Sequence, residues 1–284
     1  MDINEFKSND GITWCPGCGD FGILTALKKA LVILDRKPKD ILLVSGIGQA
    51  AKLPHYIRCN CFNGLHGRAL PVAAAAKIAN RALTVIVTTG DGDCYGEGGN
   101  HLIHNIRRNV DMTVIVHNNQ IYGLTKGQAS PTTDLGYQTK VQAGGVILEP
   151  MHPLEMAIAL GCGFVARSYS ADSGHLSGMI VEGIKHKGFS LIDVLQPCVT
   201  FNKKNNYQWY GKRVYKIDSS SYNPGDKMAA YQKAQEWEEK IPLGIIYKQE
   251  KETYEEKSGL NQKKPLVEET VEGVDIHNVL AEFV

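Results

Sequence analysis

Five nearly unbroken apolar runs, rich in β-branched residues, constrain the fold of this chain more than any other feature. They lie at residues 41–48, 82–90, 112–119, 164–170 and 190–197, and each gives way to glycine or polar residues. Such runs are typical of strands buried on both faces, as in a parallel sheet. Helical patterns separate them at 21–34, 68–81, 99–109, 153–161 and 175–187. The alternation predicts an α/β fold with a doubly wound, mostly parallel sheet.

The length of the chain fits one large domain with an appended segment. Of its 284 residues, 43% are hydrophobic and 21% are charged, which is enough apolar material for a sizeable core. From about residue 216 the sequence becomes a charged tail with one helix-like stretch and one short apolar stretch. We expect an α/β domain over residues 1–215 and a C-terminal arm over residues 216–284 that packs on a partner subunit.

Charge and cysteine content narrow the class of protein. The net charge of +1 favours neither a nucleic-acid partner nor a membrane surface. The N-terminus does not resemble a signal peptide and no apolar run is long enough to span a membrane, so we expect a cytoplasmic protein. The chain has an odd number of cysteines, seven, and such a set in this context indicates reduced thiols or metal ligands rather than disulfides.

Polar loops follow four of the predicted strands, where parallel α/β sheets bind their ligands. The loop from residue 90 begins with the Gly-Asp-Gly sequence around Asp91, and Asn119 follows 28 residues after that aspartate at the end of the next strand. Glycines at such a place let backbone N–H groups approach a phosphate, and oxygen donors there suit a divalent cation. A tight turn with a solvated Asp91 is the simpler reading of the tripeptide alone.

Taken together, the two segments resemble the thiamine-diphosphate enzymes, whose pattern is GDG followed after 25 to 30 residues by an asparagine pair. The resemblance implies that Mg²⁺ is bound by the side chains of Asp91 and Asn119 and by the carbonyl of Ile121. It also implies cofactor contacts from two sets of residues, Ile47, Gly48, Gln49 and Ala50 in the loop after the first strand, and Gly90, Gly92, Asp93, Gly123 and Leu124 around the diphosphate.

Further blocks narrow the resemblance. The stretches WCPGCGDFG, GLHGRALP, GDGDCYGEGGNHLIHNIRRN, YGLTKGQASPTT and LIDVLQPCVTFN occur in this order. Over roughly the first 210 residues they are similar to the β subunit of 2-oxoacid:ferredoxin oxidoreductases. The resemblance implies a [4Fe-4S] cluster with Cys15, Cys18 and Cys198 among its ligands.

The fourth cluster ligand is where this sequence departs from the pattern. Many relatives have a cysteine after the first strand where this chain has Gln49, although a cubane cluster normally takes four thiolates. Cys59 and Cys61 follow in the same loop, and we favour Cys59. The two would point to opposite sides of an extended segment, so both are not expected to bind one cluster. A zinc site built from Cys15, Cys18, Cys59 and Cys198 stays open as an alternative.

Three basic side chains are further candidates. His66 and Arg68 precede a predicted helix, so they could be a cap and a surface charge, but they also follow a loop at the ligand-binding edge. We favour a cofactor or substrate role for His66 and leave Arg68 open. Lys126 follows the predicted Mg²⁺ segment, and its ammonium could pair with a 2-oxoacid carboxylate or a cofactor phosphate.

The resemblance implies the oxidative decarboxylation of a 2-oxoacid with coenzyme A, and electron transfer through the cluster to ferredoxin. It favours 2-oxoglutarate, with pyruvate and other 2-oxoacids also possible. It also implies a partner α subunit that supplies the pyrimidine-binding domain and the catalytic glutamate, in an (αβ)2 or larger heteromer. The alternatives are a non-oxidative thiamine-diphosphate decarboxylase or synthase, and a non-catalytic, zinc-stabilised nucleotide-binding assembly subunit.

Overall fold

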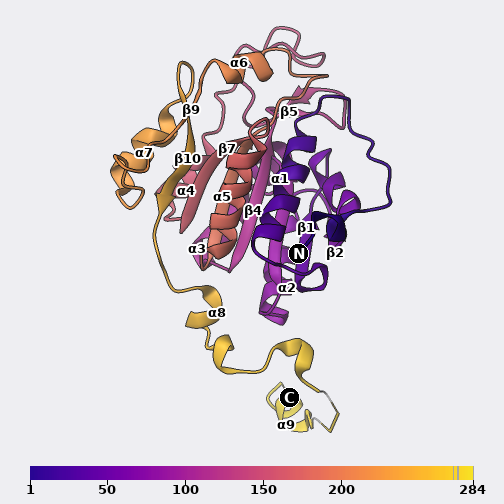
Figure 1. Ribbon diagram of the computed structural model, residues 1–284. Helices are drawn as coiled ribbons and strands as arrows, with labels where there is room; N and C mark the ends of the chain where they lie inside the picture. The colour runs from indigo at the N-terminus through magenta and orange to yellow at the C-terminus, as the bar shows by residue number, and fades with distance from the viewer. Residues whose placement is uncertain (271, 274, 284) are drawn as a thin grey trace.

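An eight-stranded, mostly parallel sheet forms the centre of the molecule (Figure 1). The computed structural model describes residues 1–270, 272–273 and 275–283. In space the strands are ordered β2 (Asn60–Asn63), β1 (Ile41–Ser45), β3 (Thr84–Gly90), β4 (Met112–Asn118), β8 (Phe189–Leu195), β7 (Phe164–Tyr169), β10 (Ile241–Lys248) and β9 (Val214–Lys216). Neighbouring strands run parallel except β7 and β10, which are antiparallel. The five predicted strands and the predicted fold class are confirmed.

Helices cover both faces of the sheet, as the doubly wound prediction requires. On one face lie α1 (Asp20–Ile33) and α5 (Ser173–Lys185), which are drawn in front of the sheet in Figure 1. On the other lie α2 (Ala69–Ala79), α3 (Gly99–Arg108), α4 (Pro153–Ala159) and α7 (Lys227–Gln235). The five helices predicted from the sequence are therefore present, each with bounds within two residues of its predicted pattern.

Alternation along the central strands divides the core into two layers. In β3, Val85 and Val87 pack with the α2 and α3 side, whereas Ile86 between them packs with the α1 and α5 side. Successive strand residues point to opposite faces, so a strand covered on both faces needs apolar residues at consecutive positions. This is why the strands read as unbroken apolar runs.

Short elements fill the carboxyl edge of the sheet. The 3-10 segment η3 (Ala50–Tyr56) follows β1, and a π-helical turn, η4 (Gly92–Glu97), follows β3 directly. A two-stranded hairpin of β5 (Ile121–Tyr122) and β6 (Gln128–Ala129) follows β4, and the short helix α6 (Tyr207–Gly211) comes after β8. Single π turns are frequent at functional sites. The predicted ligand-binding loops are thus short, structured elements at one edge.

The predicted domain boundary at residue 215 does not match the sheet. β9 begins at Val214, and β10 pairs with β7 along one side and with β9 along the other. Residues Ile241 and Ile246 of β10 are fully buried, and α7 packs on α4. The stretch that we expected to open the arm is therefore the last part of the α/β domain. Its short apolar segment is a strand of the sheet. The sequence of such a run does not show whether it joins a sheet or docks on a partner.

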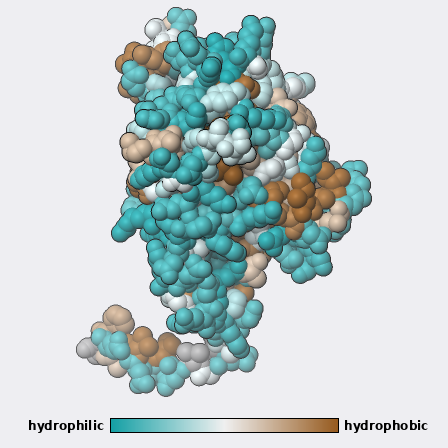
Figure 2. Space-filling model, turned by 60° about the vertical axis from the view of Figure 1, so that its left-hand side comes forward, coloured by the Kyte–Doolittle hydropathy of each residue, from teal (hydrophilic) through white to brown (hydrophobic). Residues whose placement is uncertain are grey.

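The tail proper starts after β10 and at first lies against the body, where the Tyr254 N–H donates to the Asn109 carbonyl at 3.2 Å. Beyond α8 (Tyr254–Lys257) it extends away from the sheet (Figure 1). It also contains η5 (Leu260–Gln262), η6 (Leu266–Glu268) and α9 (His277–Ala281). Figure 2 shows brown, hydrophobic atoms on the protruding tail. The exposed large hydrophobic residues of the tail are Leu266, Val267, Ile276, Val279, Leu280 and Phe283. Packing of this segment on a partner stays a prediction. None of the helices in the described part of the chain has the length and apolar character needed to span a lipid bilayer.

Candidate active site

Asp91 lies at the carboxyl end of β3, buried between two loops. Its Oδ2 accepts hydrogen bonds from the hydroxyls of Ser130 and Thr132, at 2.5 and 2.7 Å. Burial raises the pKa of Asp91 to about 6, while these hydroxyls and the backbone N–H of Asn119 act in the opposite direction. The structure thus places the backbone N–H of Asn119 against the Asp91 carboxylate. A cation shared by the two side chains stays a prediction. A divalent ion beside a buried carboxylate would favour its charged form.

Asp93 organises the loops around this corner. Its Oδ1 accepts from the backbone N–H groups of Ile47 and Gly67, at 3.2 and 2.7 Å, and lies 2.6 Å from His66 Nδ1. An added Cβ at Gly46 would lie 1.9 Å from the Asp93 carboxylate, so only glycine fits there. The same carboxylate therefore ties the loop after β1, the loop before α2 and the turn after β3 together.

The ring of Tyr122 covers Gly92, the second glycine of the motif. A Cβ at Gly92 would lie 2.2 Å from the ring, which explains the need for glycine at this position. The Tyr122 hydroxyl is within 3.2 Å of both carboxylate oxygens of Glu97, and His66 Nε2 lies 3.6 Å from Glu97 Oε2. His66 thus stands between two carboxylates, Asp93 and Glu97, with its side chain partly open to solvent.

Three cysteines line one small pocket at the same edge of the sheet. Cys15, Cys18 and Cys198 share it with Asn119, Gln49 and nearby residues of both loops. The backbone holds the pieces together, because Cys18 N–H donates to the Cys15 carbonyl at 3.0 Å and Gly19 N–H donates to the Pro197 carbonyl at 3.3 Å. The predicted convergence of the Cys-x-x-Cys segment with the last cysteine is therefore present in the fold.

Gln196 connects the cysteine pocket to the Asp91 corner. Its Nε2 donates to Cys18 Sγ at 3.5 Å, and its Oε1 accepts from Asn119 Nδ2 at 2.9 Å. Asn119 Oδ1 accepts in turn from the backbone N–H of Ile121 at 3.0 Å. Asn119, a predicted Mg²⁺ ligand, is thus linked through Gln196 by two hydrogen bonds to Cys18, a predicted cluster ligand.

A second buried connection leads from Cys18 into the sheet. Cys18 Sγ donates to Asp20 Oδ2 at 3.3 Å, and Asp20 Oδ1 lies 2.7 Å from Nδ1 of the fully buried His117. Burial, and next the charge of Asp20, raise the pKa of Cys18 well above the range of an ordinary thiol. Cys18 is therefore a protonated thiol unless a cation stabilises its thiolate form, as a bound iron does.

Cys59 and Cys61 do not reach this pocket. The segment η3 returns the chain to the amino end of the sheet, and β2 then runs parallel to β1, with Cys61 paired to Leu43. Cys59 packs against the apolar core on the α1 side, and burial raises its pKa to about 12, while Cys61 is exposed. The structure therefore gives no support to Cys59 as the fourth ligand. A parallel neighbour can only start at the opposite edge from where the preceding strand ended.

The remaining predicted residues lie in the surrounding turns. Gly123 approaches Gln49, whose Cγ would be 3.9 Å from a Cβ added at Gly123. Leu124 and Lys126 are exposed in the turn between β5 and β6, where Lys126 adopts a left-handed backbone conformation with φ of 80°. Gly48 also has a positive φ, 111°, and Ala50 is buried at the start of η3. Arg68 Nη1 donates to the His66 carbonyl at 3.5 Å.

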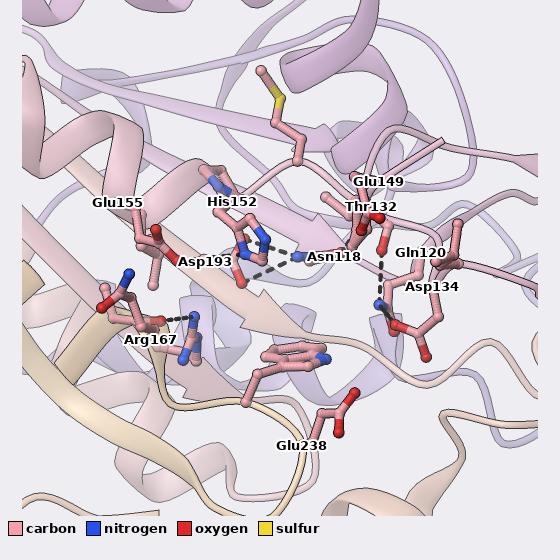
Figure 3. A pocket seen from close by; sticks show the side chains of 18 of the residues that line it. Asn118, Gln120, Thr132, Asp134, Glu149, His152, Glu155, Arg167, Asp193 and Glu238 are labelled. Atoms are coloured by element: carbon pink, nitrogen blue, oxygen red, sulfur yellow. Dashed lines mark hydrogen bonds and ion pairs between the residues drawn. The ribbon is translucent and has the colours of Figure 1, made fainter. Parts of the chain in front are cut away.

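A larger cavity of about 610 Å³ borders the far side of the Asp91 corner (Figure 3). Figure 3 shows Asn118 joined to Asp193, whose Oδ2 accepts from Asn118 Nδ2 at 3.1 Å and from the Tyr95 hydroxyl at 2.7 Å. Burial raises the pKa of Asp193, and the nearby Arg167 acts against that effect. This buried network fixes Asn118, and through it the position of Asn119.

Comparison with known proteins identifies the family. The C-terminal TPP binding domain of thiamine pyrophosphate enzymes matches residues 45–194, and the C-terminal region of the pyruvate ferredoxin oxidoreductase beta subunit matches residues 198–263. The 2-oxoacid:ferredoxin oxidoreductase subunit beta of Saccharolobus solfataricus is 49% identical, covering 86% of this chain and 84% of that protein. The chain belongs to the 2-oxoacid:ferredoxin oxidoreductase beta subunits. It is therefore a subunit of a thiamine-diphosphate-dependent oxidoreductase.

Two further relatives agree with this family. The 2-oxoacid:ferredoxin oxidoreductase 1 subunit beta of Aeropyrum pernix is 45% identical over 93% of this chain and 86% of its own length. A solved 2-oxoglutarate:ferredoxin oxidoreductase from Magnetococcus marinus, with 2-oxoglutarate, coenzyme A and succinyl-CoA bound, superimposes with a TM-score of 0.91 at 32% identity. The superposition covers 99% of this chain and 96% of that one, so the structural likeness includes β10.

Sequence reasoning missed several residues of the site. Gln196 and Asp20 lie inside blocks that carried the family resemblance, yet nothing in an isolated glutamine or aspartate indicates a contact with Cys18. Ser130 and Thr132 belong to the stretch SPTT, where clustered hydroxyls indicate a turn rather than partners for Asp91. Their position in the loops after β4, at the same edge of the sheet as Asp91, was the one sequence signal that could have placed Ser130 and Thr132 in the site.

Proposed function

We propose that this beta subunit binds thiamine diphosphate, Mg²⁺ and an iron–sulfur cluster, and takes part in the oxidative decarboxylation of a 2-oxoacid, with 2-oxoglutarate favoured. Coenzyme A would receive the acyl group and ferredoxin the electrons. When bound, thiamine diphosphate supplies an electron sink for the decarboxylation, and the cluster supplies one-electron chemistry. The observation that carries the proposal is the chain of contacts from Asp91 through Asn119 and Gln196 to Cys18.

The donor set around Asp91 fits a hard divalent cation. The Asp91 carboxylate and the Asn119 amide supply the oxygen ligands that Mg²⁺ prefers, with the Ile121 carbonyl as a third. The hydroxyls of Ser130 and Thr132 keep the Asp91 carboxylate in one orientation. The turn that begins at Gly92 presents backbone N–H groups beside this corner, where a diphosphate needs donors.

The donor set of the cysteine pocket is soft and therefore suits iron. Among the residues that the structure describes, no three His, Cys, Asp or Glu side chains stand close enough together for a single metal ion. A cubane gives each thiolate its own iron, so its ligands border a pocket without converging on one point. Cys15, Cys18 and Cys198 have this arrangement, which favours the cluster over the zinc alternative.

His66 and Lys126 would act on the reacting molecules. His66 is held by Asp93 with its other ring nitrogen toward Glu97, so it can hold or move a proton at Nε2. Lys126 lies in the exposed turn that follows Ile121, where its ammonium would attract a carboxylate or phosphate. Thiamine chemistry also needs a catalytic glutamate. A partner α subunit would provide it in an (αβ)2 or larger assembly.

The experiment that tests this proposal is anaerobic co-purification with the α subunit, followed by viologen or ferredoxin reduction. Pyruvate, 2-oxoglutarate and a branched 2-oxoacid are supplied in parallel, each with and without coenzyme A. We expect coenzyme A-dependent reduction, fastest with 2-oxoglutarate. Faster reduction with pyruvate would contradict the substrate assignment alone. The absence of iron from the purified complex would contradict the proposed electron path.

A further inference from the structure

We propose that the side-chain amide of Gln49 faces the fourth iron of the cluster, so that this iron has no thiolate ligand and can be removed and replaced. The inference rests on the proposed function, because it takes the cluster as given. It concerns only what this chain contributes to the fourth position.

The pocket supplies three thiolates for a group that carries four irons. Cys15, Cys18 and Cys198 are the cysteines among its described lining residues. Cys59 directly precedes β2 and Cys61 lies on it, toward the other edge of the sheet. A [4Fe-4S] cluster is ordinarily held by about four cysteines, one for each iron. One iron is therefore left without a thiolate from this pocket.

Three of the polar side chains that line the pocket are already engaged. Asp20 uses both oxygens, one toward His117 and the other toward Cys18. The side chains of Asn119 and Gln196 bond to each other, and their other polar atoms bond to the backbone of Ile121 and Pro197. A ligand drawn from this group would break a hydrogen bond that already exists.

Gln49 differs from these side chains. Its Oε1 is buried and has no hydrogen-bond partner within the described part of the chain. A buried acceptor without a partner is destabilising, so this oxygen calls for a partner that the protein atoms do not supply. An iron ion is such a ligand, because an amide oxygen can donate a lone pair to it.

Contacts on two sides hold Gln49 in place. The indole Nε1–H of Trp14, next to Cys15, donates to the Gln49 carbonyl at 2.9 Å. On the other side, the Gln49 side chain lies against Gly123 of the predicted diphosphate segment. Gln49 therefore lines the pocket between the cysteine segment and the predicted diphosphate segment.

The chemistry predicts a selective loss of iron. A neutral amide holds iron more weakly than a thiolate does, because it does not offset the positive charge. Ferricyanide would take one electron from [4Fe-4S]²⁺, one iron would leave as Fe²⁺, and [3Fe-4S]⁺ would remain on the three thiolates. Ferricyanide becomes ferrocyanide, no sulfide leaves, and the Gln49 oxygen is freed.

The test uses the anaerobically purified complex treated with a stoichiometric amount of ferricyanide. We expect the release of about one of the roughly four irons per cluster, unchanged acid-labile sulfide, and the electron paramagnetic resonance signal of a three-iron cluster. Reduction in the presence of ⁵⁷Fe²⁺ should refill one site, which Mössbauer spectroscopy would detect. Retention of all the iron without that signal would overturn the inference.

Variants at position 49 assign the effect to this residue and cancel any contribution from clusters on other subunits. Gln49→Cys supplies a fourth thiolate and should abolish the iron loss and the signal under the same oxidation. Gln49→Ala should lose the iron at least as readily as the unmodified chain. Equal iron loss in the unmodified chain and in Gln49→Cys would overturn the role of Gln49. Preparations that contain neither iron nor sulfide would instead refute the proposed function.

Discussion

Gln196, the residue directly after β8, donates a hydrogen bond to Cys18 Sγ at 3.5 Å. Its other amide atom accepts from Asn119 at 2.9 Å. One side chain thus contacts both a predicted cluster ligand and a predicted Mg²⁺ ligand. Hydrogen bonds to cluster sulfurs raise reduction potentials, so this contact would give the protein a means of setting the potential of the proposed cluster.

Replacing Gln196 should lower the reduction potential of the cluster. Gln196→Leu keeps a side chain of similar length but removes the N–H donor to Cys18, and a lost hydrogen bond of this kind is equivalent to tens of millivolts. A redox titration followed by electron paramagnetic resonance would measure the shift. Gln262→Leu, at an exposed glutamine of η5, is the matched control and should leave the potential unchanged. An unaltered potential in Gln196→Leu would argue against a contact with the cluster.

Removing the charge of Asp91 should weaken the binding of thiamine diphosphate. Asp91→Asn preserves the shape of the side chain but removes the anionic oxygen that Mg²⁺ prefers. We expect an affinity loss of at least about tenfold, or 1.4 kcal/mol, in calorimetric titrations with Mg²⁺ present. The exposed Asp10→Asn change serves as the control. Unchanged affinity in Asp91→Asn would place the cation elsewhere.

The cysteines should differ in reactivity when the cluster is removed. Cys15 and Cys61 are both exposed, but only Cys15 lines the pocket. In the isolated full chain, iodoacetamide should label Cys61 with or without iron, and Cys15 only after chelation of the iron. Burial raises the pKa of Cys162 to about 12, so it should stay unlabelled until the chain unfolds. Peptide mass spectrometry would read each site, and early labelling of Cys15 in the iron-loaded chain would contradict its role as a ligand.

Truncation should locate the end of the folded domain. A chain that stops at Ser258 keeps β10 and α8 and should retain the far-ultraviolet circular dichroism and thermal transition of the full chain. A chain that stops at Tyr215 loses the apolar side chains of β10, among them Ile241 and Leu243. Four such buried side chains contribute about 6–12 kcal/mol, comparable with the whole stability of a typical domain. We therefore expect the shorter chain not to fold, and cooperative unfolding of it would contradict this account.

The sequence predicted the central sheet well, because buried parallel strands leave a direct signal. Both faces of β4 are covered, so Val114, Ile115 and Val116 are apolar without alternation, and this run is visible without any tertiary information. The spacing of Asp91 and Asn119 indicated their meeting for a similar reason, since parallel strands end at one edge. These two features depend only on local pattern and on a general rule of topology.

The predictions were wrong where the role of a residue depends on its tertiary environment rather than on the local sequence. β2 is a short edge strand with four exposed residues, so its sequence does not read as apolar, and Cys59 was assigned to the wrong edge. β10 belongs to the sheet although a charged stretch precedes it, and only its pairing with β7 shows this. The contacts of Gln196 and of Gln49 likewise depend on loops that meet from distant parts of the chain.

The position of Asn119 has an evolutionary consequence. The asparagine faces the cation corner through Asp91 and the sulfur pocket through Gln196, so a substitution there disturbs both at once. If the proposed sites are occupied, a lineage that adapts the cysteine pocket to a new electron acceptor must keep this asparagine unchanged, or else rebuild the Asp91 corner together with the pocket.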